Sequence, residues 1–175
     1  MKNLIILTIA LMAPAMASAA AEFNDAQIAA IVVAANQIDI DAGKLAESKS
    51  TNAEVKAFAH RLIGEHTDVN KQATSLATKL KITPEESTTS KALKSDAKRN
   101  TDRLQKLSGK EFDKLYLSDE VAFHQQVLDT VDTKLLPSAQ NEELKALLVK
   151  VRPALVAHKE HAEKVLSIVR EMNYK

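Results

Sequence analysis

A continuous ladder of inward-facing positions between residues 141 and 172 constrains the fold more than any other feature of the sequence. Its members recur at alternating steps of four and three residues, which is the period of one face of an α-helix. They are Leu144, Leu148, Val151, Leu155, His158, Ala162, Val165, Val169 and Met172. Pro153 lies inside the ladder, and because the register continues on both sides of it, we expect a kink there, not a helix end. The sequence therefore predicts that His158 points into the core.

Three further segments carry ladders of the same kind, and a fourth, more polar segment between them is predicted to cross the surface as a short helix. The three ladder helices are expected at residues 24–48, 52–81 and 109–135, and the crossover helix at residues 91–107. The chain has only 3 glycines and 4 prolines, so it has few turns and strong helix propensity. Together with the helix at 141–172, these segments predict an all-α four-helix bundle with a short crossover helix between its second and third helices.

Local signals set the predicted ends of these helices. Thr51 with Glu54, and Ser108 with Glu111, have the spacing of capping boxes. Pro137 is expected to end the third helix. If the chain turns near residue 138, His158 lies level with residue 118, which favours a pair between His158 and Glu120. His124 is then about six residues out of level with His158, or roughly 9 Å along the axis.

The first twenty residues have the pattern of a secretory signal peptide. A short basic head is followed by the 13 apolar residues Leu4 to Met16 and then by Ala17-Ser18-Ala19. We expect cleavage after Ala19 or Ala20, which leaves residues 21–175 as one domain. No cysteine follows the apolar run, so no lipid anchor is expected, and the predicted location is periplasmic or secreted.

The charge balance limits the classes of partner. Removal of residues 1–20 takes away Lys2 and no acid, which leaves 23 basic and 23 acidic residues. A neutral chain is not expected to bind nucleic acid or an anionic membrane surface, and no later stretch is apolar enough to span a membrane. The chain has no cysteine, so disulfides and thiolate metal ligands are excluded.

Titratable side chains gather at mid-helix positions. His66 occupies an inward slot of its ladder, His124 lies on or next to the inner face one turn after Glu120, and His161 follows His158 by three residues. Asp39 and Asp41 flank the apolar stripe of the first helix, whereas His60 falls off its stripe and is expected to be exposed. The candidate metal ligands are therefore His66, His124, His158, Glu120, Asp39, Asp41 and His161.

Two functions remain open from these residues. Imidazole and carboxylate ligands suit Zn(II), Cu(II), Ni(II) or Fe, which predicts a protein that binds a divalent transition metal. The alternative is a non-metal structural or stress-related envelope protein, whose histidines are satisfied by hydrogen bonds and whose charged helix faces dock a partner. The sequence has no Ser-His-acid arrangement and no phosphate-binding loop, so no enzyme activity is predicted.

Three stretches resemble one known family. They are "IDIDAGKLAESKSTNAEVKAFAHRLIGEHTDVN", "LSGKEFDKLYLSDEVAFHQQVLD" and "LVKVRPALVAHKEHAEKVL", and the resemblance that they carry extends over nearly the whole mature chain. They are similar to a bacterial family of exported ferritin-like domains of unknown function, often labelled outer membrane or periplasmic proteins. The resemblance implies a ferritin-like bundle and strengthens the expectation of a metal.

The family pattern falls on several of the candidate residues. Its acid-x-acid motif matches Asp39 and Asp41, where the family usually has glutamate, and its later histidines match His124 and His158. Its Asp/Glu-His-Thr and Phe-Asp-x-x-Tyr motifs match residues 65–67 and 112–116. The Glu-x-x-His spacing of ferritin-type di-iron sites is missing, so ferroxidase or oxygenase chemistry is not predicted.

Overall fold

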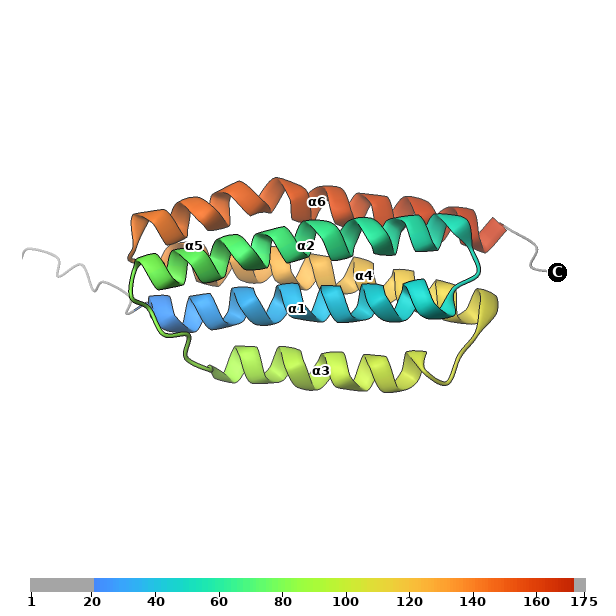
Figure 1. Ribbon diagram of the computed structural model, residues 1–175, viewed down its shortest axis with the longest axis horizontal. Helices are drawn as coiled ribbons and strands as arrows, with labels where there is room; N and C mark the ends of the chain where they lie inside the picture. Colours follow the sequence, from blue (N-terminus) through green and yellow to red (C-terminus); the bar gives the residue numbers. More distant parts are fainter. Residues whose placement is uncertain (1–20, 172–175) are drawn as a thin grey trace, which may run out of the picture.

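The computed structural model of the protein describes residues 21–171, and the predicted signal peptide lies outside this range. All regular secondary structure within it is helical, which confirms the predicted all-α class (Figure 1). The elements are α1 (Asp25–Lys49), α2 (Ala53–Lys79), α3 (Thr88–Leu104), α4 (Gly109–Thr130), the π-helical turn η1 (Val131–Leu135), α5 (Leu136–Ser138) and α6 (Glu142–Glu171). The four ladder helices thus lie close to their predicted bounds.

The helix starts are fixed by side-chain caps, some of which differ from the prediction. Helix α2 is capped by Asn52, whose Oδ1 accepts a hydrogen bond from the Glu54 amide at 2.9 Å, in place of Thr51. Helix α3 begins three residues earlier than predicted because Ser87 and Ser90 form a reciprocal cap. Ser108 precedes α4 but makes no side-chain capping bond, so the predicted box with Glu111 does not form.

The long helices form a bundle of two antiparallel hairpins. One hairpin is α1 with α2, and the other is α4 with α6 (Figure 1). Helix α1 also packs on α4, and α2 also packs on α6, so the four helices enclose one interior. Helix α3 runs along the outside of the bundle between the end of α2 and the start of α4, and it packs on α1 and α4. The site described below is assembled where α1, α2, α4 and α6 face one another.

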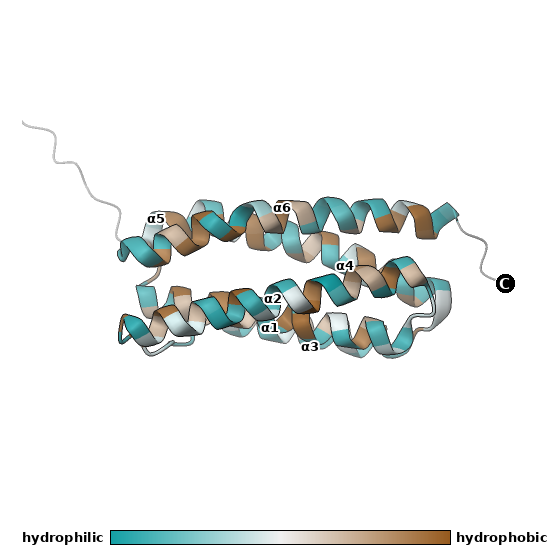
Figure 2. Cartoon of the chain, turned by 45° about the horizontal axis from the view of Figure 1, so that its top comes forward, coloured by the Kyte–Doolittle hydropathy of each residue, from teal (hydrophilic) through white to brown (hydrophobic). Residues whose placement is uncertain are grey.

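The apolar core is divided into two clusters along the bundle axis. One cluster contains Ile28, Leu135 and Leu148, and the other contains Phe58, Leu117 and Val165. Apolar residues of the helices are interspersed with hydrophilic ones along their whole length (Figure 2). Between the two clusters, at mid-length, the inward positions are taken by polar residues. No helix within residues 21–171 combines the length and the apolarity needed to cross a membrane.

The connection between α4 and α6 differs from the prediction. The chain stays helical through η1 and α5 as far as Ser138, so Pro137 does not end the helix. The turn follows at residues 139–141, where the Asp25 carboxylate accepts hydrogen bonds from the amides of Gln140 and Asn141 at 2.9 and 3.0 Å. A turn centred at residue 140, and not at 138, brings His158 level with residue 122, within one helical turn of His124.

Candidate metal centre

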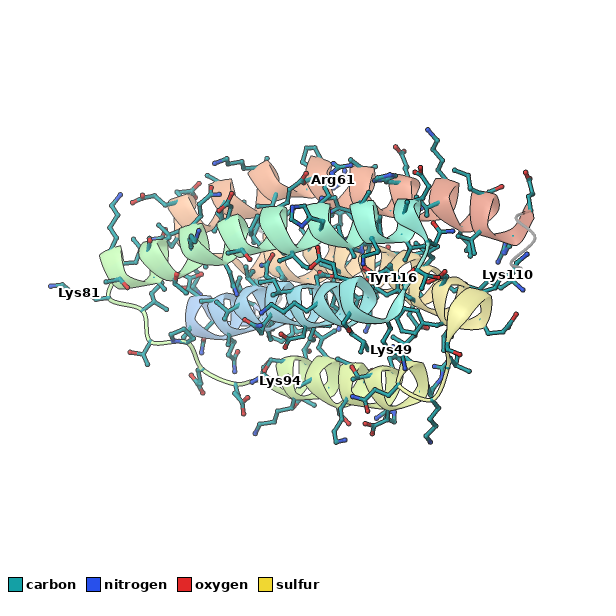
Figure 3. All side chains as sticks on the ribbon, turned by 45° about the vertical axis from the view of Figure 1, so that its right-hand side comes forward. Lys49, Arg61, Lys81, Lys94, Lys110 and Tyr116 are labelled. Carbon is teal, nitrogen blue, oxygen red and sulfur yellow. The ribbon has the colours of Figure 1, made fainter. Side chains whose placement is uncertain are left out.

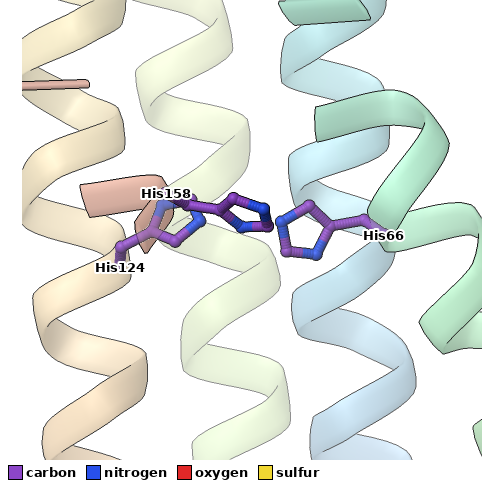
Figure 4. Close-up of side chains that lie close together, drawn as sticks. All are labelled: His66, His124 and His158. Atoms are coloured by element: carbon purple, nitrogen blue, oxygen red, sulfur yellow. The ribbon is translucent and has the colours of Figure 1, made fainter. Parts of the chain in front are cut away.

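The imidazole rings of His66, His124 and His158 meet in the polar layer at mid-length (Figure 4). They come from α2, α4 and α6, and each residue is at most 3 % exposed. Their ring centroids are 5.0 to 5.6 Å apart, so the rings form a nearly equilateral triangle. One nitrogen of each ring lies within 4.8 Å of a nitrogen of both other rings.

Each ring is oriented by a hydrogen bond at one of its nitrogens. The Nδ1–H of His66 donates to Asn36 Oδ1 at 2.8 Å, and the Asn36 amide group in turn donates to the Val32 carbonyl. The Nδ1–H of His124 donates to the Glu120 carbonyl at 3.0 Å. The Nε2–H of His158 donates to Glu65 Oε2 at 2.6 Å. Since every partner is an oxygen acceptor, these nitrogens carry the protons, which fixes the tautomer of each neutral ring.

The opposite nitrogens are left with lone pairs and no donor. Among residues 21–171, the Nε2 atoms of His66 and His124 and the Nδ1 atom of His158 are buried without a hydrogen-bond partner. Leaving a buried acceptor unpaired costs about 1–3 kcal/mol. A single water molecule has two hydrogens to donate and can satisfy at most two of the three. A cation that accepts all three lone pairs satisfies the whole cluster.

Two buried carboxyl groups adjoin the triangle. Asp39 Oδ2 lies 3.5 Å from His66 Nε2, and Glu120 Oε2 lies 3.5 Å from His124 Nδ1. Asp39, Glu120 and His124 also form a group whose possible ligand atoms lie within 4.8 Å of one another. The two carboxyl groups lie close enough for each to shift the pKa of the other. The centre therefore offers carboxylate oxygens beside the three imidazole nitrogens.

Burial keeps the histidines neutral. It lowers the pKa of His66 to about 3, with a smaller contribution from the neighbouring charges of His158 and His124. Burial also lowers the pKa of His124 to about 4. The pKa of His158 is lowered by burial and partly restored by its contact with Glu65. All three rings are therefore unprotonated at neutral pH, which is the form that binds metals.

Burial acts in the opposite direction on the acids. It raises the pKa of Asp39 to about 8, while the hydrogen bond with Glu120 works against that rise. The pKa of Glu120 is raised well above its usual range by burial and by the charges of Asp39 and Asp119. Burial and the nearby Glu120 likewise raise the pKa of Tyr116. A cation beside these carboxyl groups would oppose their protonation and favour the charged form.

The candidate residues predicted from the sequence do not all meet. The structure brings together Asp39, His66, Glu120, His124 and His158. Asp41 lies on the exposed face of α1 and accepts a hydrogen bond from Gln37 at 2.9 Å. His161 lies outside both groups; its ring packs against Phe58, and its Nδ1 is 3.3 Å from Arg61. His60 is exposed, as expected, and contacts Glu47.

One predicted pairing is replaced by another. Glu120 was expected beside His158, but the partner of His158 is Glu65, and Glu120 lies beside Asp39 and His124. The predicted separation between His124 and His158 is absent as well, because their ring centroids are 5.3 Å apart. The second difference follows from the position of the turn before α6, two residues later than expected, whereas the contact between Glu65 and His158 depends on how α2 packs on α6.

Sequence reasoning did not identify Asn36 and Glu65 as site residues. Asn36 is buried one turn before Asp39, and a polar residue at that depth on α1 is the signal that was available. The Glu65 side chain is 43 % exposed and immediately precedes His66, so its own helix gives no sign that it reaches α6. Its pKa is lowered although burial pushes it upward, because hydrogen bonds from Arg61 and His158 favour the carboxylate.

Comparisons with known proteins add one finding. Residues 10–165 match the model of a family described as "Domain of unknown function (DUF4142)". This match covers most of the chain, in agreement with the resemblance to a family of unknown function. Neither the comparison with curated proteins nor the comparison with solved structures gave a match.

Proposed function

Since the chain belongs to the DUF4142 family of domains of unknown function, we propose a function from its own residues: it binds a divalent transition metal ion at the centre of the bundle. His66, His124 and His158 would supply the nitrogen ligands, and Asp39 the nearest carboxylate. One observation carries the proposal, namely three buried imidazole rings that lie within ligand distance of one another and each keep one nitrogen without a hydrogen-bond partner. The proposed role is binding, and no reaction is assigned to the site.

The donor set selects a class of metal. Neutral imidazoles with a carboxylate suit Zn(II), Cu(II), Ni(II) and Fe(II), whereas the absence of cysteine removes the thiolate ligands that soft ions prefer. Zinc–nitrogen bonds of about 2.0–2.1 Å in a tetrahedron separate the nitrogens by about 3.3 Å. Because the nitrogens lie within 4.8 Å of one another, small side-chain rotations would close the site around such an ion.

The hydrogen bonds outside the triangle support the same assignment. Metal-binding histidines commonly donate their second ring N–H to a carboxylate or a carbonyl, which sets the tautomer and orients the ring. His158 has Glu65, His124 has the Glu120 carbonyl and His66 has the Asn36 amide oxygen in this role. The alternative, a purely structural core, requires partners for the inner nitrogens as well, and residues 21–171 provide none.

The finer fold assignment and the location belong to the same proposal. The bundle would be ferritin-like, with α1, α2, α4 and α6 as its four helices and α3 as the crossover; the placement of α3 outside α1 and α4 supports this. Residues 1–20 would be removed on export, and the mature protein would reside in the periplasm. The amino terminus of the fractionated protein is then expected at Ala20 or Ala21, and recovery of Met1 would contradict export.

Calorimetry tests the metal site directly. The chelator-stripped protein is titrated near pH 7.5 with Zn(II), Cu(II), Ni(II) and, without oxygen, Fe(II). We expect one of these ions to bind with a stoichiometry of one and to raise the melting temperature. His158→Ala should remove both effects, and His60→Ala, which changes an exposed histidine, should leave them intact. Heat signals that are equal for the wild type and His158→Ala would refute the site.

A further inference from the structure

A groove of about 630 Å³ leads from the surface toward the proposed metal centre. It lies between the crossover helix α3 and the pair α1 and α4. Tyr116 lies on α4 and Lys94 on α3, and both residues line this groove (Figure 3). Asp39 and Glu120 line it as well, although they are only 2 % and 4 % exposed. The groove therefore ends at the carboxyl groups that adjoin His66 and His124.

The charges along the groove favour a cation. Six acids and two lysines line it: Asp39, Asp41, Asp96, Asp102, Asp119 and Glu120, with Lys94 and Lys98. Two of the acids are neutralised within α3, because Asp102 pairs with Lys98 at 2.9 Å and Asp96 pairs with Arg99. Asp119 is half-buried, and its Oδ2 has no hydrogen-bond partner among residues 21–171. Burial raises the pKa of its carboxyl group, and the charge of Arg103 on α3 opposes that rise without a hydrogen bond to Oδ2.

The other two sides of the centre are unsuited to a hydrated ion. On one side lies a cavity of about 90 Å³ that touches His66, His158 and Asp39, but the rest of its lining is mostly aliphatic and includes Ile31, Val127 and Leu155. A hydrated ion that entered along the aliphatic part of this lining would lose water molecules before it met a polar group. On the α2–α6 side, Arg61 donates to Glu65 Oε1 at 2.7 Å, so its guanidinium group stands beside the outer partner of His158 (Figure 3). The ion pair leaves no free carboxylate on this side to attract a cation, and it covers the outer nitrogen of His158.

We propose that the metal ion reaches the three histidines through the groove beneath α3, guided by Asp119 and handed inward by Asp39 and Glu120. This inference rests on the proposed metal site and adds its route of access. Asp39 is placed for the transfer because its Oδ2 lies 3.5 Å from the unpaired Nε2 of His66, and Glu120 is placed beside Asp39 at the same end of the groove. Asp119 is not a ligand of the centre, so it acts on the rate and not on the affinity.

The test measures the rate at which Co(II) binds to the chelator-stripped protein by stopped-flow absorbance, beside an equilibrium titration with the same ion. Asp119→Asn should lower the association rate constant at low salt by about threefold or more, because one attractive charge on the route is lost. The dissociation rate should fall in proportion, so Kd should stay within about twofold of the wild type. Asp129→Asn is the matched control, because it removes an exposed acid of the same helix α4 that does not line the groove.

The outcomes separate the two proposals. If the wild type binds no Co(II) at equilibrium, the metal site fails and the route fails with it. If the wild type binds Co(II) but Asp119→Asn and Asp129→Asn associate at the same rate, the route alone is overturned. Arg61→Gln provides a further check, because faster association in this variant with no change in Asp119→Asn would place the route on the α2–α6 side instead.

Discussion

His158 on α6 donates from its Nε2 to Glu65 Oε2 on α2 at 2.6 Å, and this bond joins the two hairpins across the outer edge of the polar layer. The imidazole is 2 % exposed, whereas the Glu65 side chain is 43 % exposed and is also held by Arg61. The carboxylate thus keeps the proton of His158 on the outer nitrogen. The Nδ1 atom is left buried with an unpaired lone pair.

Glu65→Ala should therefore weaken metal binding without removing a ligand. Loss of such an outer partner typically costs 10- to 100-fold in metal affinity, because the ring loses its orientation and its preferred tautomer. Calorimetric titration of Glu65→Ala measures the change. Glu47→Ala is a suitable control, since Glu47 makes the same type of contact with the exposed His60 at 2.8 Å. Equal affinities for Glu65→Ala and the wild type would contradict the orienting role.

The metal-free protein should lose stability as the pH rises from about 6.5 to 8. Burial raises the pKa of Asp39 from 3.8 to about 8, so its contribution is present at low pH and is lost as the pH rises through the folded-state value. The histidines change the stability only below this pH range. In the folded protein the pKa of His66 is about 3 and that of His124 is about 4, whereas histidines of the unfolded chain take up protons below about pH 6.5. The expected slope is roughly 1 kcal/mol per pH unit for each retained proton.

Urea denaturation at pH 6.5, 7.2 and 8.0 measures this slope. Asp39→Asn provides the comparison, because an amide mimics the protonated carboxyl group at every pH. Its free energy of unfolding should fall less over the same range than that of the wild type. A wild-type stability that is constant or rises between pH 6.5 and 8.0 would show that the carboxyl pair holds no extra proton.

His158→Leu should be tolerated by the metal-free fold although it removes a ligand. The position belongs to a ladder of aliphatic residues, and leucine has a similar volume. The substitution removes one of the three buried nitrogens that have no hydrogen-bond partner, and Glu65 keeps its hydrogen bond from Arg61. We expect the free energy of unfolding to stay within about 1 kcal/mol of the wild type or to increase. His158→Ala leaves a cavity and should cost about 2 kcal/mol, so equal losses in the two variants would disprove this packing argument.

Replacing each of two helical glycines by alanine should change the free energy of unfolding in opposite directions. A Cβ at Gly43 would lie 2.8 Å from Ile63 Cγ1 and 3.2 Å from the Ala59 carbonyl oxygen, because α1 and α2 approach closely there. A Cβ at Gly64 would meet nothing within 4 Å. Gly64→Ala should raise the free energy of unfolding by up to about 1 kcal/mol, since alanine favours the helix. Gly43→Ala should lower it by about 1 kcal/mol through overpacking, and a gain in stability at both positions would contradict the close contact.

The helices could be predicted because each amphipathic ladder has a single period, and the same ladders placed His66 and His158 among inward slots. Helix geometry also explains why Asp39 and Asp41 diverge. Side chains two residues apart on an α-helix point in directions that differ by about 200° around the helix axis, so only one of the two can face the interior. The structure buries Asp39 and exposes Asp41.

The rest of the site depended on relations between helices that no single ladder contains. The pairing of His124 with His158 depends on where the chain turns, and a π-helical turn followed by Pro137 inside a helix moved that turn beyond Ser138. The contact of Glu65 with His158 depends on the rotation of α2 against α6. Sequence periodicity determines which face of a helix is buried, but not which residue of a neighbouring helix lies opposite.

The polar layer between the two apolar clusters also limits how the helices can slide past one another. Aliphatic ladders alone would permit α2, α4 or α6 to shift by one turn, because one leucine would replace another with little change in packing. Such a shift would separate the rings of His66, His124 and His158 and bury each of them against side chains with no hydrogen-bonding capacity. We therefore expect the histidine layer to select one alignment of the bundle, as a single buried asparagine does in a coiled coil.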